Sequence, residues 1–292
     1  MKLFEDSLSS GCHLAVLVSI VIILLIIEPV MTTTATNAGL QHPAIQLPRL
    51  IAHRGYSAAA PENTLAAVSA AHAAGASWVE LDVQLLGDGT PVIWHDADVS
   101  RCSDSRRKLR NLDWEQAQQL DVGGWFSDAF AGERMASLEA MLNLLNALNM
   151  GANLELKVNK GRDPVALVET CLPLIQAALP PEQMIISSFN QQALQACREQ
   201  ADARTLALGI LCNALPADWQ AQAESLQAFS LHPHWARLKR TQVAAVKRAG
   251  YPLLSYTVND PSAFAPYWHW GVDSAITDQP EVFRRYMDNQ AN

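Results

Sequence analysis

Acidic side chains stand at alternate positions in two otherwise apolar segments of this sequence. Glu80 and Asp82 lie in "VELDV", and Glu155 precedes Lys157 by two positions in "LELK". Successive side chains of a β-strand point to opposite faces, so the members of each pair would share one face. If the leucine inside each pair packs outward beneath helices, the charged side chains face the interior of the fold.

Three carboxylates gathered at one point repel one another and are costly to remove from water. A hard divalent cation offsets both costs, and a set of oxygen ligands suits Mg²⁺ or Ca²⁺ better than zinc. We therefore predict that Glu80, Asp82 and Glu155 bind a divalent cation, Mg²⁺ or Ca²⁺.

Two histidines lie close to these acids in the predicted fold. His53 follows the apolar run "LIA", and His95 lies near the end of "TPVIWHD". An imidazole exchanges protons near neutral pH, so the pair is suited to acid–base catalysis. Each residue also has a structural interpretation, such as a loop histidine, a solvated acid or a simple Glu155–Lys157 ion pair. Their coincidence near the carboxyl ends of apolar runs favours one joint site.

The segments that carry these residues belong to a regular alternation of apolar runs and helical patterns. Eight runs are typical of buried strands, at 50–53, 78–83, 152–157, 184–188, 205–211, 226–231, 253–258 and 274–277. Seven helix candidates lie between them, at 63–74, 137–148, 164–178, 190–200, 216–224, 241–249 and 261–269. This order predicts an α/β fold of parallel βα units, a (β/α)8 barrel with its active site at the carboxyl ends of the strands. A doubly wound open sheet is the main alternative, weakened because the sequence has no GxGxxG or GxxxxGK[ST] loop.

One apolar run breaks the alternation. It spans 90–96 and follows "ELDVQLL" after only "GDG", which is too short for a crossover helix and typical of a tight turn. We therefore predict that 90–95 pairs antiparallel with 81–86 as a hairpin that extends the second strand. The polar stretch 97–135 then reads as a small insertion over the end of the barrel where that strand finishes.

Composition excludes some classes of partner. The chain has 292 residues and is 49% hydrophobic, which suits one large domain or two small ones. Its formal net charge of −8 gives no basic surface for nucleic acid. Anions can still bind where Arg, Lys or a metal ion concentrates positive charge locally. Five cysteines lack CxxC or zinc-ligand spacing, so we interpret them as buried thiols in a reducing compartment.

The first 40 residues are interpreted as a hydrophobic N-terminal extension and linker (1–40), outside a barrel domain at 48–285. Residues 14–27, "LAVLVSIVIILLII", are long and apolar enough for a signal-peptide core or a marginal membrane span. Their leading flank carries Glu5 and Asp6 against a single Lys2, which is poor for a signal peptide.

Met31 offers a second start for translation, and we favour the interpretation that the upstream segment is not made in the cell. The expected location is then the cytoplasm. The alternatives are a membrane-anchored or an exported protein, and contact with a membrane is expected only if residues 14–30 are a real anchor.

The chain as a whole resembles a known family. "AHRG…PENT", "VELDVQLLGDGTPVIWHD", "LELK", "SSF", "YTVN" and "GVDSAITD" occur in the order and spacing of the glycerophosphodiester phosphodiesterases. The resemblance runs from about Leu50 to Asp278 and is strongest to the cytosolic bacterial enzymes. It implies a TIM barrel that cleaves small-molecule glycerophosphodiesters to sn-glycerol 3-phosphate and an alcohol.

The resemblance also implies a role for each residue of the site. Glu80, Asp82 and Glu155 would hold the cation, and His53 and His95 would be the acid–base pair. Arg54 and Lys157 would contact the phosphate. We assign His53 as the base and His95 as the acid, although the order of the two could be reversed.

Secondary candidates have structural interpretations of comparable weight. Glu62 is expected to orient His53 or the metal shell, or to be a first-turn helix acid, and Asn63 is either an N-cap or a functional residue. Other residues that could touch substrate are Tyr256 and Asn259, whereas core or loop roles are favoured for Trp94, Phe189, His232 and His234. The basic "SRRKLR" is expected to be a solvated face that could attract an anionic headgroup.

Two other functions are compatible with parts of the pattern. A barrel aldolase would use Lys157 as a Schiff-base nucleophile, but neighbouring Glu80 and Asp82 would keep that lysine charged. A membrane-tethered phosphate-binding protein without catalysis is the other alternative, and the pair of His53 and His95 counts against it.

Overall fold

The computed structural model describes residues 41–291 of the chain. The predictions for residues 1–40, and with them the expected location in the cell, lie outside the described residues. Within the described part, none of the helices combines the length and the apolar character needed to cross a membrane.

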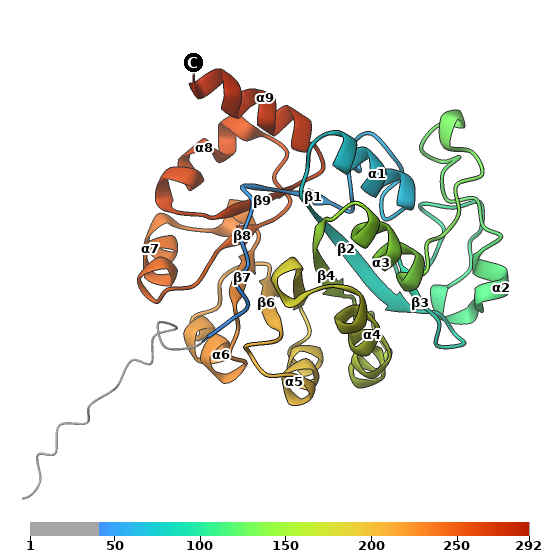
Figure 1. Cartoon of the computed structure of the whole chain (residues 1–292), viewed down its shortest axis with the longest axis horizontal. Coiled ribbons are helices and arrows are strands. Elements are labelled where there is room, and N and C mark those ends of the chain that lie inside the picture. Colours follow the sequence, from blue (N-terminus) through green and yellow to red (C-terminus); the bar gives the residue numbers. More distant parts are fainter. Residues whose placement is uncertain (1–40, 292) are drawn as a thin grey trace, which may run out of the picture. The chain divides into compact units, whose positions relative to one another are not determined.

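Eight parallel strands form the barrel that the sequence predicts (Figure 1). They are β1 (Leu50–His53), β2 (Trp78–Leu85), β4 (Gly151–Leu156), β5 (Met184–Ser188), β6 (Ala207–Cys212), β7 (Ser230–Pro233), β8 (Leu254–Ser255) and β9 (Ser274–Thr277). Their order is β7-β6-β5-β4-β2-β1-β9-β8. Isolated parallel bridges at Leu231–Leu253 and His234–Tyr256 join β7 to β8, so the barrel is nearly closed.

Helices follow the strands along the chain and surround them in Figure 1. They are α1 (Leu65–Ala73), α3 (Leu138–Ala147), α4 (Pro164–Ala178), α5 (Gln191–Gln200), α6 (Trp219–Ser225), α7 (Arg240–Arg248), α8 (Pro261–Trp270) and α9 (Pro280–Ala291). Several begin at a side chain that accepts a hydrogen bond from a free backbone N–H, namely Thr64, Ser137, Asp163, Asn190 and Asp260. The seven predicted helices are all present, and α9 was not predicted.

One predicted strand is wrong in position. The segment 226–231 was expected to be extended, but Leu226 is the C-cap of α6 and Gln227 follows with a φ of 46°. That left-handed residue turns the chain, and β7 begins only at Ser230. The alternating pattern of "LQAFSL" fits a strand as well as it fits this helix end and turn, so periodicity alone could not separate them.

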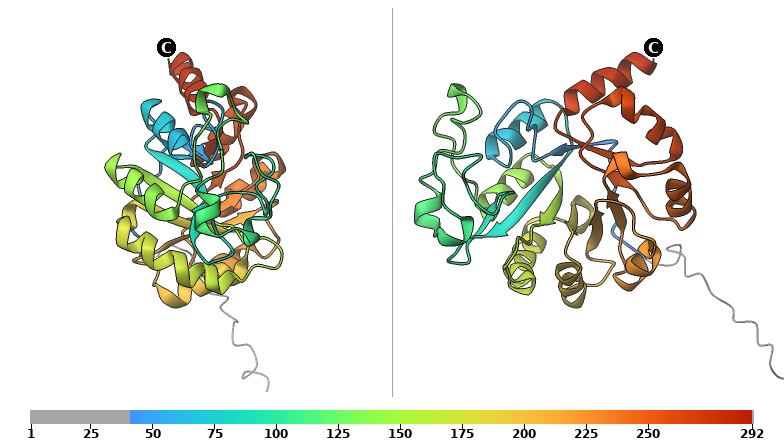
Figure 2. Two further views of the ribbon diagram at one scale, coloured as in Figure 1. Left: turned by 90° about the vertical axis from the view of Figure 1, so that its right-hand side faces the viewer. Right: turned by 180° about the vertical axis from the view of Figure 1, so that it is seen from behind.

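The predicted hairpin and insertion are both present. β3 (Pro91–Ile93) pairs antiparallel with β2, and Ile93 lies opposite Val83. The insertion at 97–135 contains the short helix α2 (Trp114–Ala117) and lies to one side of the barrel, beyond the end of β2 (Figure 2). It has a small core of its own, formed by Leu86, Val92, Trp94, Val99, Cys102, Leu109, Leu112, Ala117, Val122 and Met135.

The barrel interior changes character along its axis. Near the amino ends of the strands it is filled by an apolar layer of Ile51, Trp78, Ile185, Ala207, Phe229, Leu254 and Ile276. The Trp78 indole lies so close to β4 that a Cβ on Gly151 would be 2.2 Å from its Cε2 atom, so only glycine fits there. Because Glu80 and Asp82 follow Trp78 on the same face of β2, the polar residues rest on this apolar floor.

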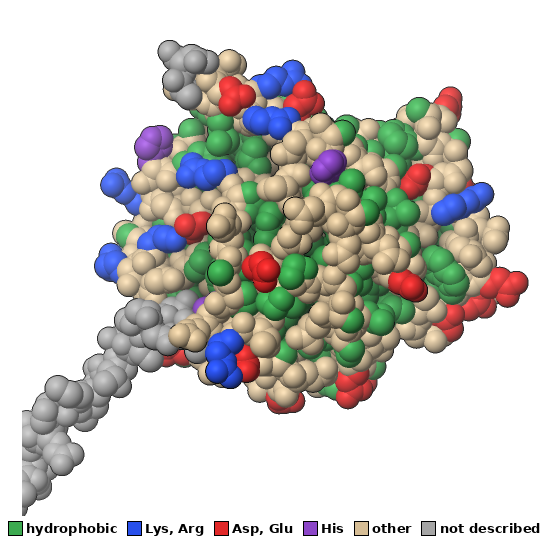
Figure 3. Space-filling model, in the orientation of Figure 1, with side chains coloured by type: hydrophobic (Ala, Val, Ile, Leu, Met, Phe, Trp, Pro, Cys, Tyr) green, Lys and Arg blue, Asp and Glu red, His purple; other side chains and the backbone are tan. Residues whose placement is uncertain are grey.

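The opposite faces of the strands are apolar and covered by helices. Leu81 and Leu156 are both buried in the core between strands and helices, which confirms that the alternating acids face inward. On the outer face that Figure 3 shows, Lys and Arg side chains are interspersed with acidic and neutral ones rather than joined in one basic patch.

Candidate active site

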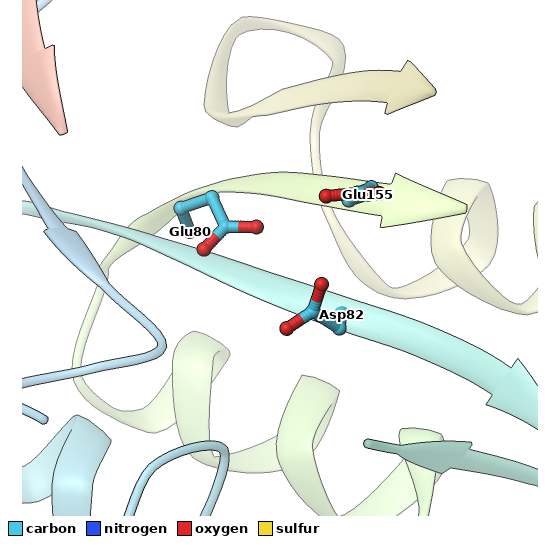
Figure 4. A group of neighbouring side chains, drawn as sticks. All are labelled: Glu80, Asp82 and Glu155. Atoms are coloured by element: carbon cyan, nitrogen blue, oxygen red, sulfur yellow. The ribbon is translucent and has the colours of Figure 1, made fainter. Parts of the chain in front are cut away.

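The three predicted acids converge from two neighbouring strands. Parallel pairing of β2 with β4 places Asp82 beside Glu155, and Glu80 beside Asn153. One carboxylate oxygen from each of Glu80, Asp82 and Glu155 lies within 4.8 Å of the others, and all three residues are buried. Figure 4 shows the carboxylates of Glu80 and Asp82 on β2 pointing toward that of Glu155 on β4.

The electrostatics of this cluster fit a cation. Burial raises the pKa of Glu80 well above its usual range, and the charges of Asp82 and Glu155 raise it further. Burial and the Asp82 charge likewise raise the pKa of Glu155 to about 7. Ionising all three groups together therefore needs additional positive charge, and an all-oxygen set of ligands at this spacing suits a hard divalent ion.

Asp82 behaves differently because two cations contact it. Its carboxylate lies 3.1 Å from Nζ of Lys157 and 3.3 Å from Nε of Arg54. Burial opposes ionisation, but Lys157 and then Arg54 outweigh it and lower the pKa of Asp82 far below its usual range. Lys157 also lies 3.0 Å from Glu155. Burial by itself would lower the pKa of Lys157, yet the charges of Asp82 and Glu155 reverse the effect and raise it.

Two strained backbone positions hold this arrangement. Arg54 has a φ of 55° and Asn63 a φ of 60°, which non-glycine residues seldom adopt. The Asn63 amide donates to Oδ2 of Asp82 at 2.9 Å, and the Asp82 backbone N–H donates back to the Asn63 side chain at 3.2 Å. Asn63 therefore positions Asp82. The prediction that it caps the helix is wrong, because Thr64 is the N-cap of α1.

Each histidine is held by an aspartate. Nδ1 of His53 lies 2.6 Å from Oδ1 of Asp278, and Nδ1 of His95 lies 2.6 Å from Oδ1 of Asp96. Several hydrogen bonds, that of His53 foremost, overcome burial and hold the pKa of Asp278 at about 2. An ionised carboxylate can only accept, so Nδ1 of His53 must be the donor. Its other nitrogen, Nε2, then faces the acidic cluster, 3.7 Å from Glu80.

A bridge from the insertion links the two sides of the site. Arg101 donates to both carboxylate oxygens of Glu62 and to Asp96, each at 2.7 Å. Glu62 also accepts from Arg54 at 2.7 Å. The structure does not place Glu62 against His53, as one prediction had it, because both of its oxygens are taken by arginines. The roles of Asp96, Arg101 and Asp278 were not predicted from the sequence.

These side chains border a cavity of about 180 Å³. Its lining consists of His53, Arg54, Glu80, His95, Asn153, Glu155, Lys157, Phe189, Leu211, Tyr256, Thr257 and Ile276. The cavity thus has one charged wall, from β1, β2 and β4, and one largely apolar wall across the barrel. All seven predicted site residues lie together here, with Asp82 directly behind the charged wall in contact with Arg54 and Lys157.

The apolar wall corrects one prediction. Phe189 was expected in the core, but it is 44% exposed and packs edge-on against Tyr256 at the cavity. The Tyr256 hydroxyl donates to the carbonyl of Cys212. Asn259 does not line the cavity, and its amide instead donates to Asp278, the partner of His53.

His232 was expected in a loop, and this prediction is also wrong. It is fully buried on β7, away from the cavity, where its Nε2 lies 2.8 Å from the Ser230 hydroxyl. His234 packs edge-on against Tyr256 just beyond the strand.

One further residue of the cavity has side-chain atoms without a hydrogen-bond partner in the described part of the chain. Asn153 is completely buried next to Glu80, and neither its amide nitrogen nor its oxygen finds a hydrogen-bond partner among residues 41–291. Buried amides are nearly always hydrogen-bonded, so this one marks a place where water or a bound group supplies the missing bonds. The position supports a polar ligand immediately beside the carboxylates.

The fold and site together define a barrel enzyme whose acidic cluster, two oriented histidines and two partly buried cations suit chemistry on an anionic group. Comparison with known proteins gives the same class. The model of the glycerophosphoryl diester phosphodiesterase family matches residues 53–282. The chain therefore belongs to this family, as its sequence motifs predicted.

Individual relatives agree with this assignment. A Caldanaerobacter subterraneus subsp. tengcongensis protein named glycerophosphodiester phosphodiesterase is 34% identical over 233 residues, which cover 80% of this chain and 95% of that protein. The solved structure of an Oleispira antarctica phosphodiesterase, in complex with the product sn-glycerol-3-phosphate, matches with a TM-score of 0.79 and 34% identity. The match covers 83% of this chain and 97% of the Oleispira antarctica chain. A glycerophosphodiester phosphodiesterase from Agrobacterium tumefaciens matches with a TM-score of 0.67 and 25% identity, over 81% of this chain and 99% of its own.

Proposed function

We propose that this protein hydrolyses glycerophosphodiesters to sn-glycerol 3-phosphate and an alcohol, with His53 and His95 as acid–base catalysts beside a divalent cation. The observation that carries the proposal is the convergence of three carboxylates, two histidines and two partly buried cations around one cavity. Family membership and the product bound in the Oleispira antarctica relative support the substrate class.

The histidines would act in two steps. In the first, Nε2 of His53 takes the proton from the 2-hydroxyl of the glycerol, whose oxygen attacks phosphorus. The bond from phosphorus to the alcohol breaks, and the leaving oxygen receives a proton from His95. In the second step, His95 removes a proton from water, which opens the cyclic phosphate, and His53 returns its proton to the glycerol oxygen.

The carboxylates of Asp278 and Asp96 would fix both rings for these transfers. Each accepts a hydrogen bond from Nδ1, which orients the imidazole and leaves Nε2 to exchange protons. His53 and His95 enter the cavity from β1 and from the end of the hairpin, so they approach a bound phosphate from different elements.

Arg54 and Lys157 would contact the phosphate oxygens. Both lie in the charged wall of the cavity, and the neighbouring acids raise the pKa of each above its usual value despite burial. Both therefore stay charged and offset the negative charge that develops on phosphorus-bound oxygens. A lysine whose pKa is raised is a poor amine nucleophile, and this disfavours the aldolase alternative.

Glu80, Asp82 and Glu155 would hold the cation, with Mg²⁺ or Ca²⁺ as the expected ion. Bound there, a divalent cation would supply Lewis acidity that neutralises phosphate charge and lowers the pKa of the glycerol hydroxyl.

A coupled assay for glycerol 3-phosphate tests the proposal. Purified protein is given glycerophosphocholine or glycerophosphoethanolamine, with and without EDTA. We expect EDTA to abolish release of glycerol 3-phosphate, and Mg²⁺ or Ca²⁺ to restore it. Substituting Glu80→Ala or His53→Ala should lower turnover at least about 10²-fold, the scale of losing an electrostatic or acid–base element.

Glu199→Gln is a matched control, because Glu199 is an exposed acid on α5 that does not line the cavity. Its turnover should equal that of the wild type. Turnover that survives EDTA, or that is unaffected by loss of either Glu80 or His53, would contradict the proposed mechanism.

A further inference from the structure

A second and larger cavity lies beside the catalytic one, between the insertion and the loop that follows β4. Its volume is about 460 Å³. Four basic side chains line it, two from each side: Lys108 and Arg110 from the insertion, and Lys160 and Arg162 from the loop. We call this cavity, defined by these four residues, the basic groove.

The cations of the basic groove form no direct ion pairs within the described part of the chain, although Asp98 lies opposite Lys108 and the Lys108 charge helps to lower the Asp98 pKa. Among residues 41–291, no carboxylate forms an ion pair with any of the four. Asp98 is the acid among the lining residues, and its carboxylate accepts hydrogen bonds from the backbone and hydroxyl of Ser100. Asp163, next in the chain to Arg162, caps α4 instead.

Two of the cations repel each other. Arg162 is partly buried and donates to the carbonyls of Leu85 and Leu86, at 2.6 and 3.1 Å. Burial lowers the pKa of Arg162, and the charge of Arg110 lowers it further. The Arg110 guanidinium lies only 3.8 Å from where a Cβ on Gly161 would stand, so it faces the same loop. Like charges held together in this way favour the binding of an anion between them.

The floor of the basic groove lies next to the catalytic residues. Gln84 follows Asp82 by two residues on the same face of β2, roughly 7 Å along the strand. Asn159 lies in the loop that follows β4, two residues beyond Lys157. The Asn159 amide donates to the Gln84 side chain at 2.8 Å. Gln84 in turn donates to the carbonyls of Trp94, His95 and Asp96.

This connection indicates which part of a substrate would reach the basic groove. His95 belongs to the catalytic cavity, and its backbone carbonyl accepts a hydrogen bond from Gln84, which lines the groove. In the proposed mechanism His95 protonates the leaving alcohol, whereas the glycerol faces His53. The alcohol portion therefore leaves the reacting phosphorus in the direction of the four cations.

We propose that the basic groove is a subsite for an anionic group on the alcohol portion of the substrate, foremost a second phosphate. This inference rests on the proposed function and narrows its substrate class to glycerophosphodiesters whose alcohol is itself phosphorylated. Glycerophosphocholine, with a cationic alcohol, is then the substrate class that the groove disfavours.

Two compounds that differ only in the second phosphate test this subsite. The kcat/KM of glycerophosphoinositol 4-phosphate is compared with that of glycerophosphoinositol. We expect the phosphorylated compound to be favoured about tenfold or more, since a charge-assisted contact contributes at least this factor. The gain should lie mainly in KM, because the second phosphate takes no part in the reaction.

The double variant Arg110→Glu/Lys160→Glu should remove this preference, because it places acids where the second phosphate would bind. Arg106→Glu is the matched control. It makes the same change of charge in the same insertion, but Arg106 does not line the basic groove. Its preference should equal that of the wild type. Equal kcat/KM values for the two compounds in the wild type, or a preference that the double variant keeps, would overturn the proposal.

Binding separates this inference from the proposed function. Both compounds are titrated calorimetrically into His53→Ala, which keeps the basic groove and lacks the proposed base. Tighter binding of glycerophosphoinositol 4-phosphate, lost on adding Arg110→Glu/Lys160→Glu, supports the subsite even if no substrate is turned over. Equal binding of the two compounds refutes it, even if glycerol 3-phosphate is released normally.

Discussion

The acidic cluster and the basic groove are neighbours, linked by Gln84 on β2, yet the protein pairs the charges of one and leaves those of the other without ion pairs. In the cluster, Asp82 contacts both Arg54 and Lys157, so part of the acidic charge is offset inside the protein. In the groove, the protein brings four cations together without forming an ion pair to any of them within the described part of the chain. The first arrangement stabilises the catalytic centre, whereas the second leaves charge available for a ligand.

The sharpest way to break this comparison is to remove one cation from each region. Lys157→Met removes the ion pair of Glu155 and one of the two cations beside Asp82, while both acids stay buried. It should cost about 3–5 kcal/mol of unfolding free energy, the usual result of breaking a buried pair. Turnover should also fall at least about 10²-fold, because a charge that faces the phosphate is lost.

Lys160→Met is the matched change in the basic groove. Lys160 is exposed and forms no ion pair with the rest of the described chain, so the unfolding free energy of this variant should stay within about 0.5 kcal/mol of the wild type. Urea denaturation of both variants measures the difference. If Lys157→Met and Lys160→Met lower the unfolding free energy by the same amount, the distinction between a catalytic centre with ion pairs and a groove without them is wrong.

The second prediction concerns the pairing of His53 with Asp278. Asp278→Asn removes the ionised acceptor of Nδ1, so the ring loses its fixed orientation. We expect kcat to fall about 10- to 10²-fold, as is typical when the outer partner of a functional histidine is lost, while KM changes little. Steady-state kinetics with glycerophosphoethanolamine separate the two constants.

Ser57→Ala is its control. Ser57 donates to the same oxygen of Asp278 at 3.0 Å, so this variant removes a hydrogen bond and keeps the charge. A clearly smaller loss of kcat is expected. Equal losses in the two variants would mean that the charge on Asp278 is unimportant to His53.

Strand periodicity was sufficient to predict which face of β2 and β4 carries the acids, because side chains alternate and Leu81 and Leu156 had to be buried. Strand periodicity could not predict the register between the strands. Whether Asp82 or Glu80 lies beside Glu155 depends on the stagger of the closed barrel, which a single strand does not encode.

Other parts of the site depend on contacts between distant segments. Asp278 lies 225 residues from His53, and its position directly after the apolar run "SAIT" is the signal that could have identified it. The same reasoning had selected His53 at the end of β1. Arg101 offered no such signal, because it lies in the irregular insertion and reaches Glu62 only through the fold.

The buried residue His232 avoids charge by staying neutral, and this provides a test of stability against pH. His232 is fully buried, with no charged partner among residues 41–291, so burial lowers its pKa to about 3. In the unfolded chain a histidine has a pKa of about 6.5. Between these values the unfolded state binds an extra proton. Stability should therefore fall with decreasing pH below about 6.5, by up to about 1.4 kcal/mol per pH unit.

His232→Gln should remove this part of the pH dependence, measured as unfolding free energies in urea from pH 7 to pH 5. His72→Gln, which alters an exposed histidine of α1, should leave the slope as in the wild type. An unchanged slope in His232→Gln would show that His232 binds the same number of protons in the folded and the unfolded state, which contradicts the prediction.

The smallest predicted effect uses salt to separate the two regions. Counterions screen exposed charges strongly, since the Debye length falls from about 10 Å at 0.1 M salt to about 3 Å at 1 M. The KM of glycerophosphoinositol 4-phosphate should therefore rise severalfold with added sodium chloride, because Lys108, Arg110 and Lys160 are exposed. The buried pair of Lys157 and Asp82 is largely shielded from ions, so the unfolding free energy should change much less. Glycerophosphocholine serves as the control substrate, and a KM that rises equally for both compounds would place the salt effect at the catalytic phosphate instead of the groove.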